Sequence, residues 1–195
     1  MHYNKKYVLK EVVQIAAGYP FRGRIPERPD GSISILQMKD ISPNYNVAWD
    51  SLAKVDPLPN RKPVFLKKED VVFNGRGTRI FAQNVGSVPC KVVAAPQLFV
   101  LSPKDPKTLP SSYLTWYINS SFGQSYLYKN ARGTSILNVT RSTLENFPIW
   151  IPSKAEIESF SGYIDAIKRE QELAITLHER RTTLIESILR KGMEE

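Results

Sequence analysis

The sequence is poor in the two residue types that most often build metal and redox sites. It has a single cysteine, Cys90, and only two histidines, His2 and His178. One cysteine excludes an internal disulfide framework and is typical of a reducing compartment. No stretch approaches the ~18 consecutive apolar residues of a membrane helix. The start at Met1 is not followed by the apolar run of a secretory signal. We therefore expect a cytoplasmic protein with no membrane partner.

The sequence also lacks the motifs of catalysis. There is no G-x-x-x-x-G-K-[ST] phosphate loop, no H-E-x-x-H pattern and no paired-cysteine metal pattern. A two-metal nuclease site needs several carboxylates, yet Asp105 is the only one between Val71 and Leu144. A DNA methyltransferase would need a cofactor loop and an (N/D)PP(Y/F) motif, and neither is found. We expect a protein that is not an enzyme and holds neither a metal nor a cofactor.

Acidic residues are scarce in the middle of the chain. The net charge is +8, and the segment Val71–Leu144, with eight basic residues and one acidic residue, carries +7 of it. The segment Glu145–Glu195 is mildly acidic, with seven basic and ten acidic residues. A long stretch nearly free of carboxylates suits a surface that faces a polyanion such as DNA. The alternative interpretation is a solvated basic face that binds nothing.

The chain is expected to divide after Pro152 into a mixed region, 1–152, and a long helix within 153–195. Ser153 and Glu156 form an S-x-x-E capping box, and only Gly162 weakens the helix before about Lys191. At ~1.5 Å per residue the helix would be on the order of 57 Å long, too long to be buried by a domain of this size. A wide apolar stripe follows its length, which favours pairing with a second helix, while packing on its own domain is the alternative. The candidate pairing residues are Ile157, Phe160, Ile164, Ile167, Leu173, Leu177, Leu184 and Ile188.

The first region has the pattern of an α+β domain. A helix over Val8–Ala17 ending at Gly18 is expected first, and the loop-like segment 42–63 follows a strand in Ser32–Asp40. Further strands are expected at Asp70–Asn74, Arg79–Gln83, Cys90–Ala94 and Gln97–Leu101, followed by helices at Ser111–Asn119 and Phe122–Lys129 and a strand at Ile149–Pro152. Ser121 and Gln124 suggest a capping box for the second of these helices. This order predicts a globular domain with a curled, mixed or antiparallel sheet and flanking helices, followed by one long coiled-coil-type helix.

Three loops supply candidate DNA contacts. Each combines arginine or lysine with small polar residues, and these residue types read guanine or adenine edges and grip phosphates. Ordinary turn chemistry is the alternative for each loop, because glycine, asparagine, threonine and serine are common in turns. The candidates are Arg22, Arg24, Arg28, Asn74, Arg76, Thr78, Arg79, Lys129, Arg132, Thr134, Ser135 and Asn138.

Aromatic residues recur at helical spacing in the expected helix pair. A buried core is the favoured interpretation, and a platform for stacking bases is the alternative. The residues are Tyr113, Trp116, Tyr117, Phe122, Tyr126 and Tyr128.

Taken in order, these segments resemble the specificity subunit of Type I restriction-modification systems, a phage-defence family. The resemblance spans nearly the whole chain; each motif is loose, and the order and spacing are the more specific features. Its motifs are carried by Val8–Gly18, Gln37–Ile41, Lys68–Gly77, Tyr113–Gln124, Gly133–Leu137 and Leu144–Pro152. In that family one chain carries two target-recognition domains and two helices that pair antiparallel as a spacer. This chain has one of each and so resembles a half-subunit.

The resemblance implies a DNA-recognition subunit whose two copies pair through the helix 153–191 as a homodimer. By two-fold symmetry such a dimer would read a palindromic, bipartite site on double-stranded DNA. It implies modification subunits, which methylate adenine with S-adenosylmethionine, as partners, and it leaves a restriction subunit open. It also leaves open whether the chain serves a full methyltransferase complex or acts as a truncated regulator. The alternative function is a protein-interaction adaptor that works mainly through its long helix and has an incidental basic surface.

Overall fold

The computed structural model describes residues 5–21, 23–41, 47–133 and 135–193. The chain forms two compact units, Met1–Ile157 and Glu158–Glu195. The division lies after Ile157 rather than after Pro152, where we expected it. The reason is that the first turn of α5 (Lys154–Met193) belongs to the globular unit, since the Ile157 side chain is only 4% exposed within that core.

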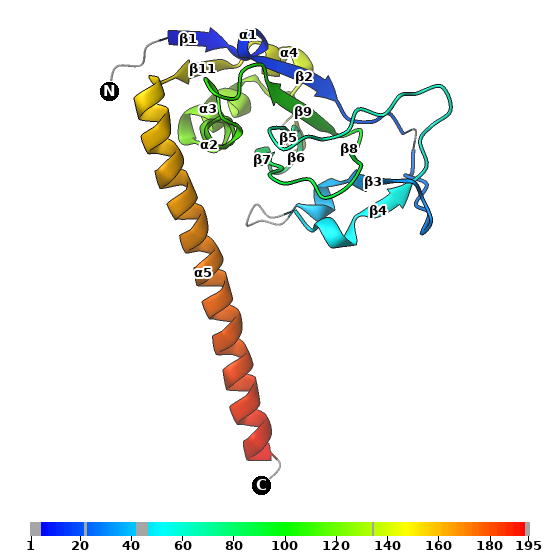
Figure 1. Cartoon of the computed structure of the whole chain (residues 1–195), viewed down its shortest axis with the longest axis vertical. Coiled ribbons are helices and arrows are strands. Elements are labelled where there is room, and N and C mark those ends of the chain that lie inside the picture. The colour runs from blue at the N-terminus through cyan, green and yellow to red at the C-terminus, as the bar shows by residue number, and fades with distance from the viewer. Residues whose placement is uncertain (1–4, 22, 42–46, 134, 194–195) are drawn as a thin grey trace. The chain divides into compact units, whose positions relative to one another are not determined.

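The globular unit is built on a four-stranded antiparallel sheet (Figure 1). Its strand order is β2 (Val13–Ala17), β9 (Leu98–Pro103), β5 (Val71–Asn74) and β7 (Phe81–Asn84). Side chains alternate between the two faces of a strand. Accordingly, Val71 and Phe73 of β5 pack into one apolar cluster and Val72 packs into another. The sheet therefore separates two hydrophobic cores.

Two helices cover the first of these cores. They are α2 (Ser111–Asn119) and α3 (Ser121–Asn130), and Tyr113, Leu114 and Ile118 are among the α2 residues buried there. The side-chain amide of Asn119 accepts a hydrogen bond from the Ala82 amide and donates one to the Ala82 carbonyl, both at 2.8 Å. Asn119 thus provides hydrogen-bond partners for the backbone amide and carbonyl of one residue of β7, an edge strand of the sheet.

A smaller sheet forms the other end of the globular unit. Its order is β4 (Ala53–Val55), β3 (Ile33–Leu36) and β8 (Val92–Ala94), with β3 and β8 parallel. The 3₁₀ turns Met38–Asp40 and Trp49–Ser51 lie in the segment between β3 and β4. Leu36 packs into the second core, whereas Ile35 packs into a third cluster with Val55 and Val93.

The two ends of the globular unit's chain are tied together at its opposite side. There β1 (Lys5–Val8) pairs antiparallel with β11 (Pro148–Ile151), and Lys5 lies opposite Ile151 (Figure 1). The short helices α1 (Leu9–Val12) and α4 (Arg141–Glu145) flank this pair in the chain. The Tyr113 hydroxyl donates a 2.7 Å hydrogen bond to the Trp150 carbonyl, which fixes α2 to β11.

The α+β class and most predicted elements are confirmed. The predicted helix Ser111–Asn119 matches α2, and the strands predicted near Asp70–Asn74 and Gln97–Leu101 match β5 and β9. The capping box at the start of α5 is present: the Ser153 amide donates to the Glu156 carboxylate (3.0 Å), and the Glu156 amide donates to the Ser153 hydroxyl (3.4 Å). These features depend on local sequence, which is why they could be predicted.

The predicted helix Val8–Ala17 is wrong beyond its first turn. Only Leu9–Val12 is helical, and the chain continues as β2. Val13 and Ile15 are buried and alternate with exposed Gln14, and β2 pairs with β9 along its length. Gly18 is no helix cap but a point of close approach, because a Cβ there would collide with the Ala95 carbonyl. Tertiary pairing therefore overrides the local helix pattern.

Three smaller expectations also need correction. The segment 42–63 is not wholly irregular, since it contains β4, and its part 42–46 lies outside the described residues. The N-cap of α3 is Ser120 rather than Ser121, and its hydroxyl accepts from the Gly123 amide. The expected aromatic core holds Tyr113 and Tyr117, with Tyr126 packed against it, whereas three of the six aromatics are exposed: Trp116, Phe122 and Tyr128.

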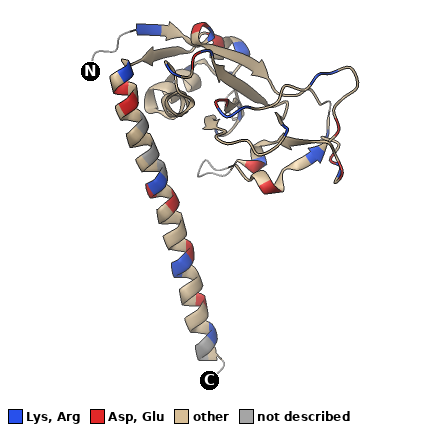
Figure 2. Cartoon of the chain, in the orientation of Figure 1, with Lys and Arg blue, Asp and Glu red and all other residues tan. Residues whose placement is uncertain are grey.

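The helix α5 spans 40 residues, about 60 Å at ~1.5 Å per residue. Acidic and basic residues are interspersed along it (Figure 2). Between them lie large apolar side chains that are half or more exposed to solvent. Among these are Ile167, Leu173, Leu177, Leu184, Ile185, Ile188 and Leu189.

Candidate nucleic-acid interface

A small β-ribbon joins two of the three loops proposed from the sequence. The strand β6 (Arg76–Gly77) pairs antiparallel with β10 (Leu137–Asn138). A further antiparallel bridge links Asn138 to Arg132, whose backbones exchange hydrogen bonds of 2.8 and 2.9 Å. Segments about sixty residues apart in the chain thus form one surface. We call the segment pair Gly75–Arg79 and Lys129–Val139 the basic ribbon.

Three polar side chains form a row across the basic ribbon. Arg76 lies opposite Asn138 on one side, and Arg132 lies opposite Asn138 on the other. Directly opposed residues of antiparallel strands present their side chains on the same face. All three residues are exposed, whereas Leu137 and Val139 pack against the core beneath. We call Arg132, Asn138 and Arg76 the polar row.

The backbone sets the spacing within the polar row. The Val139 amide donates to the Gly75 carbonyl at 2.7 Å, which makes Asn138 and Arg76 a non-hydrogen-bonded pair, with Cα atoms typically ~4.5 Å apart. Asn138 and Arg132 are a hydrogen-bonded pair, with Cα atoms typically ~5.5 Å apart. The row therefore spans roughly 10 Å. Among the residues that the structure describes, no side-chain hydrogen bond or ion pair engages any of its three members.

Two glycines and one buried amide shape the basic ribbon. A Cβ at Gly75 would lie 2.9 Å from the Phe73 ring and 3.2 Å from the Val139 carbonyl, so a larger residue there would push against the ring and the facing strand. Gly133 has a φ of 90°, and a Cβ there would collide with the Ile136 carbonyl. Asn74 donates a 2.7 Å hydrogen bond to the Arg79 carbonyl, which closes the turn that carries Arg76.

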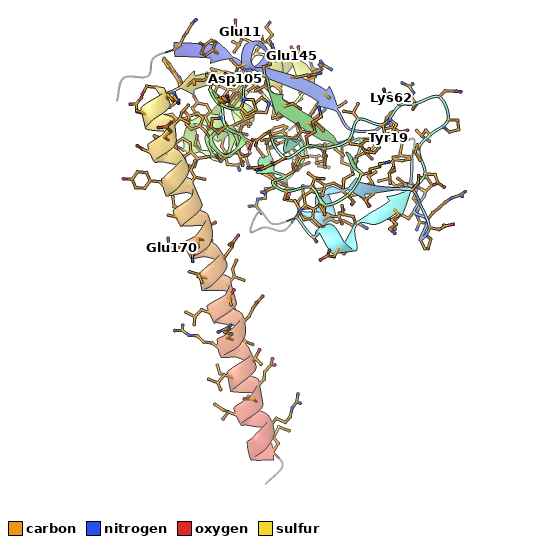
Figure 3. The ribbon with its side chains drawn as sticks, in the orientation of Figure 1. Glu11, Tyr19, Lys62, Asp105, Glu145 and Glu170 are labelled. Atoms are coloured by element: carbon orange, nitrogen blue, oxygen red, sulfur yellow. The ribbon has the colours of Figure 1, made fainter. Side chains whose placement is uncertain are left out.

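The one carboxylate of the basic middle segment lies away from the basic ribbon. The end of β5 at Asn74 leads into the ribbon, and β9 runs antiparallel to it, with Leu98 opposite Asn74. Asp105 follows the other end of β9, beyond Pro103 (Figure 3). Hydrogen bonds from the Thr108 hydroxyl and the Lys107 amide hold the pKa of Asp105 below its ordinary value. This fixed negative charge therefore stands at the far end of the sheet.

Several other predicted residues lie in the basic ribbon and are exposed. They are Thr78, Arg79, Lys129 and Ser135. The Arg79 guanidinium lies 5.6 Å from the centre of the Phe81 ring, a cation–π contact. Ile136, which follows Ser135, is 62% exposed. We did not propose it from the sequence, because a lone apolar residue in a polar loop carries no pattern.

Two predicted residues have other roles or environments than we expected. Asn74 is 1% exposed, so its side chain is closed to any ligand in this structure and serves the turn instead. The Arg28 guanidinium pairs with the Asp56 carboxylate at 3.4 Å, and both side chains are at least half exposed. Exposed pairs of this kind are worth ~0–1 kcal/mol and exchange readily with other partners. Arg22 and Thr134 lie outside the described residues.

The first predicted loop faces a separate hollow. Arg24, together with Phe21, Gln37 and Gln97, lines an open depression of about 390 Å³ near the smaller sheet. The Gln37 side chain donates a long, 3.4 Å hydrogen bond to Glu27, which itself pairs with Lys39 at 3.6 Å. The glutamines were not proposed from the sequence, because the strand pattern of 32–40 gave no sign that Gln37 would meet the segment after β8.

The predicted pairing residues of the helix fall into three groups by exposure. Ile157 is buried in the globular core, so this prediction is corrected: its side chain is used within its own chain. Phe160 and Ile164 are half-buried. The remaining residues are 49% to 62% exposed: Ile167, Leu173, Leu177, Leu184 and Ile188.

The described residues form neither a metal-binding cluster nor a membrane-spanning helix. In the ranges given above, no group of three or more histidine, cysteine or carboxylate side chains could hold a metal ion. Within the same ranges, no helix is both long and apolar enough to cross a membrane.

Comparisons with known proteins place the chain in a family. Residues 2–186 match the model of the Type I restriction modification DNA specificity domain. The chain therefore belongs to that family, whose domains confer specificity and are not catalytic. No curated protein matches the chain.

Solved structures that match this chain with TM-scores above 0.5 share its fold. The HsdS subunit from Thermoanaerobacter tengcongensis is 18% identical with a TM-score of 0.58, over 86% of this chain and 38% of that chain. A structure described as the basis of complex assembly and conformational transition of the type I R-M system is 16% identical, TM-score 0.51, over 86% and 40%. The S subunit from M. genitalium is 15% identical, TM-score 0.45, over 75% and 34%. The chain thus spans well under half the length of these proteins.

Proposed function

We propose that this chain reads a specific DNA sequence on behalf of a Type I restriction-modification complex. The observation that carries the proposal is the polar row, where Arg132, Asn138 and Arg76 stand together and unengaged on a ribbon poor in carboxylates. A two-stranded ribbon fits the major groove of B-DNA, where arginine and asparagine distinguish bases. The flanking Lys129 and Arg79 are suited to phosphates.

Catalysis would then reside in partner subunits. The chain itself would have no turnover, because it carries no recognisable catalytic motif. Modification subunits would methylate adenine at the site that this chain selects, and a restriction subunit would be a further partner. The cytoplasmic location expected from the sequence stays a prediction.

The helix α5 supplies the pairing surface in this proposal. Leucines and isoleucines that are half or more exposed on a helix of about 60 Å favour a second helix as their partner. Two copies joined through α5 would present two basic ribbons related by a two-fold axis. Such a dimer would read two half-sites, and the helix pair would set the distance between them.

The test is selection of duplexes from a randomised pool by the purified full chain, followed by affinity measurements across a salt series. We expect a split, palindromic consensus, with specific duplexes bound ~10³-fold or more tightly than unrelated ones. Equal affinity for all duplexes at moderate salt would contradict the proposal.

Paired arginine variants separate DNA recognition from an adaptor function. Arg76→Ala and Arg132→Ala should lose DNA binding. Arg61→Ala is the matched control: it removes the same charge from the loop next to Lys62, on the side of the unit that carries Tyr19 (Figure 3), where the Tyr19 hydroxyl bonds the Arg61 backbone at 2.9 Å. An adaptor that acts through α5 would still bind its partner in all three variants. In that case the wild-type chain would show no preference among DNA sequences.

A further inference from the structure

The chemistry of the polar row suggests more than a general affinity for DNA. A surface built only for phosphates needs positive charge, and lysine or arginine would serve at every position. The central member of the row is instead Asn138, a neutral amide held between two arginines. Asparagine adds nothing to phosphate attraction, but its amide matches the N6 and N7 edge of adenine.

The two arginines have the geometry of base readers as well. A guanidinium binds the O6 and N7 of guanine with two parallel hydrogen bonds. Arg76 and Arg132 flank Asn138 on the same exposed face, and no described residue competes for either guanidinium. Three consecutive base pairs are separated by two steps of ~3.4 Å, about 7 Å in all, so a row of roughly 10 Å is long enough to cover them.

The backbone beneath the row restricts where these groups can go. Asn138 is held by backbone hydrogen bonds to Arg132 on one side, and its neighbour Val139 is bonded to Gly75 on the other. Val139 is buried, so the strand cannot rotate without losing core packing. Arg76 sits in a turn closed by Asn74. Such a backbone fixes the register of three side chains relative to one another, which base readout needs and phosphate binding does not.

We propose that the polar row is the base-reading element of the domain, and that it reads a half-site in which an A·T pair lies between two G·C pairs. Asn138 binds the adenine, while Arg76 and Arg132 bind the two guanines, all in the major groove. The remaining basic residues of the ribbon bind the flanking phosphates. This inference rests on the proposed function and adds to it the residues and the bases that they read.

Charge-conserving variants test the inference, because they separate base readout from phosphate binding. Arg76→Lys and Arg132→Lys keep the positive charge but lose the two-pronged guanidinium. We expect each to retain non-specific binding and its salt dependence, while the preference for guanine falls roughly 10- to 100-fold at one position of the selected consensus. The two variants should affect different positions.

The central position is tested by Asn138→Ala and Asn138→Ser. Both should lose the preference for adenine at a position between those affected by the arginine variants, with little change in the affinity for unrelated DNA. Lys129→Ala is the matched control for a phosphate contact. It should weaken binding to all duplexes alike and reduce the slope of log affinity against log salt by about one. Circular dichroism and melting temperature of each variant establish that it folds.

The outcomes distinguish the inference from the function on which it rests. Loss of single consensus positions in the lysine variants supports the inference. If the lysine variants instead leave the consensus unchanged, while Arg76→Ala and Arg132→Ala lower the affinity for all duplexes alike, the two arginines are phosphate contacts. That result overturns the inference but leaves the proposed function standing. A wild-type chain that selects no consensus overturns both. If any variant is unfolded, the comparison is made with Asn138→Ser, the mildest change, and an unaltered consensus there is again contrary to the inference.

Discussion

The side-chain amide of Asn74 donates a 2.7 Å hydrogen bond to the carbonyl of Arg79, across the turn that carries Arg76. Asn74 is 1% exposed, and its side-chain oxygen, Oδ1, has no hydrogen-bond partner among the described residues. We expected Asn74 to touch DNA, but its side chain instead holds the turn of Arg76, the residue that we propose contacts DNA. The distinction between a contacting and a positioning residue can be measured.

Asn74→Ala should weaken both stability and DNA binding. The loss of one buried hydrogen bond lowers the free energy of unfolding by about 1–3 kcal/mol, and the released turn no longer fixes Arg76. Gln83→Ala is the matched control on the adjacent strand. Gln83 is also buried, and its side-chain amide donates one hydrogen bond of 2.7 Å, to the Asn84 carbonyl. Its side-chain oxygen, Oε1, likewise has no partner among the described residues, but Gln83 lies outside the basic ribbon. Chemical denaturation and DNA titration of both variants test this. A similar loss of DNA affinity in both would mean that stability alone accounts for the effect.

Gly133→Ala should disrupt the basic ribbon without removing any candidate contact. A Cβ at this position would collide with the Ile136 carbonyl, and its φ of 90° already strains any other residue. Gly86→Ala isolates the collision, because Gly86 has a φ of 61° but open space around its Cβ position.

We expect Gly86→Ala to cost about 1 kcal/mol of stability, as a left-handed alanine does, and to bind DNA normally. Gly133→Ala should lose DNA affinity at least ten-fold. Binding by Gly133→Ala equal to that of Gly86→Ala would show that the ribbon's geometry does not matter for recognition.

Asp40 gives the globular unit a predictable response to pH. Burial raises the pKa of its carboxyl above the ordinary value, although the hydrogen bond from the Gln37 amide (2.8 Å) and the nearby Lys39 charge oppose the shift, and Glu27 adds to it. The folded state therefore holds this proton more tightly than the unfolded state. The cost of burying the charge is complete above the folded pKa and is relieved as the pH falls through it.

Asp40→Asn removes that cost and keeps an acceptor for the Gln37 amide. The variant should be more stable than wild type at neutral pH, and the difference should shrink as the pH falls through the raised folded pKa toward the ordinary value for aspartate. Urea denaturation at a series of pH values measures it. A difference that grows toward acid pH would show that Asp40 contributes a favourable ionised interaction instead.

Structure that depends on neighbours in the chain could be predicted from the sequence. The capping box of Ser153 and Glu156, the helix α2 and the long helix α5 follow from local patterns, and all three are present. Structure that depends on pairing between distant segments could not be predicted. The local pattern of Val13–Ala17 fits a helix, but these residues form a strand because they pair with β9, more than eighty residues later in the chain.

The basic ribbon shows the same limit within the candidate site. Its strands β6 and β10 have two residues each, too short for any periodicity to reveal. The residue types of both loops could be read as DNA contacts, and most of those described are exposed. The pairing of the two loops with each other could not be predicted, because it depends on the packing of Val139 and on the close approach allowed by Gly75. The sequence therefore yielded the candidates, and the fold selected the row.

The helix α5 offers a final prediction, on association. Leu177→Glu places a charge in the apolar stripe at a side chain 49% exposed, so the globular unit should keep its melting temperature while self-association is lost. Ile157→Glu, at the buried start of the same helix, should instead unfold the globular unit, because an unpaired buried charge costs several kcal/mol. Thr183→Glu is the control for added charge, since at ~3.6 residues per turn it lies on the side of the helix away from the apolar stripe. Sedimentation at micromolar concentration, without partner subunits, should show dimers for wild type and Thr183→Glu and monomers for Leu177→Glu. A monomeric wild-type chain would mean that the exposed stripe is reserved for the helices of another protein, and the two half-sites would then have to be joined by that partner.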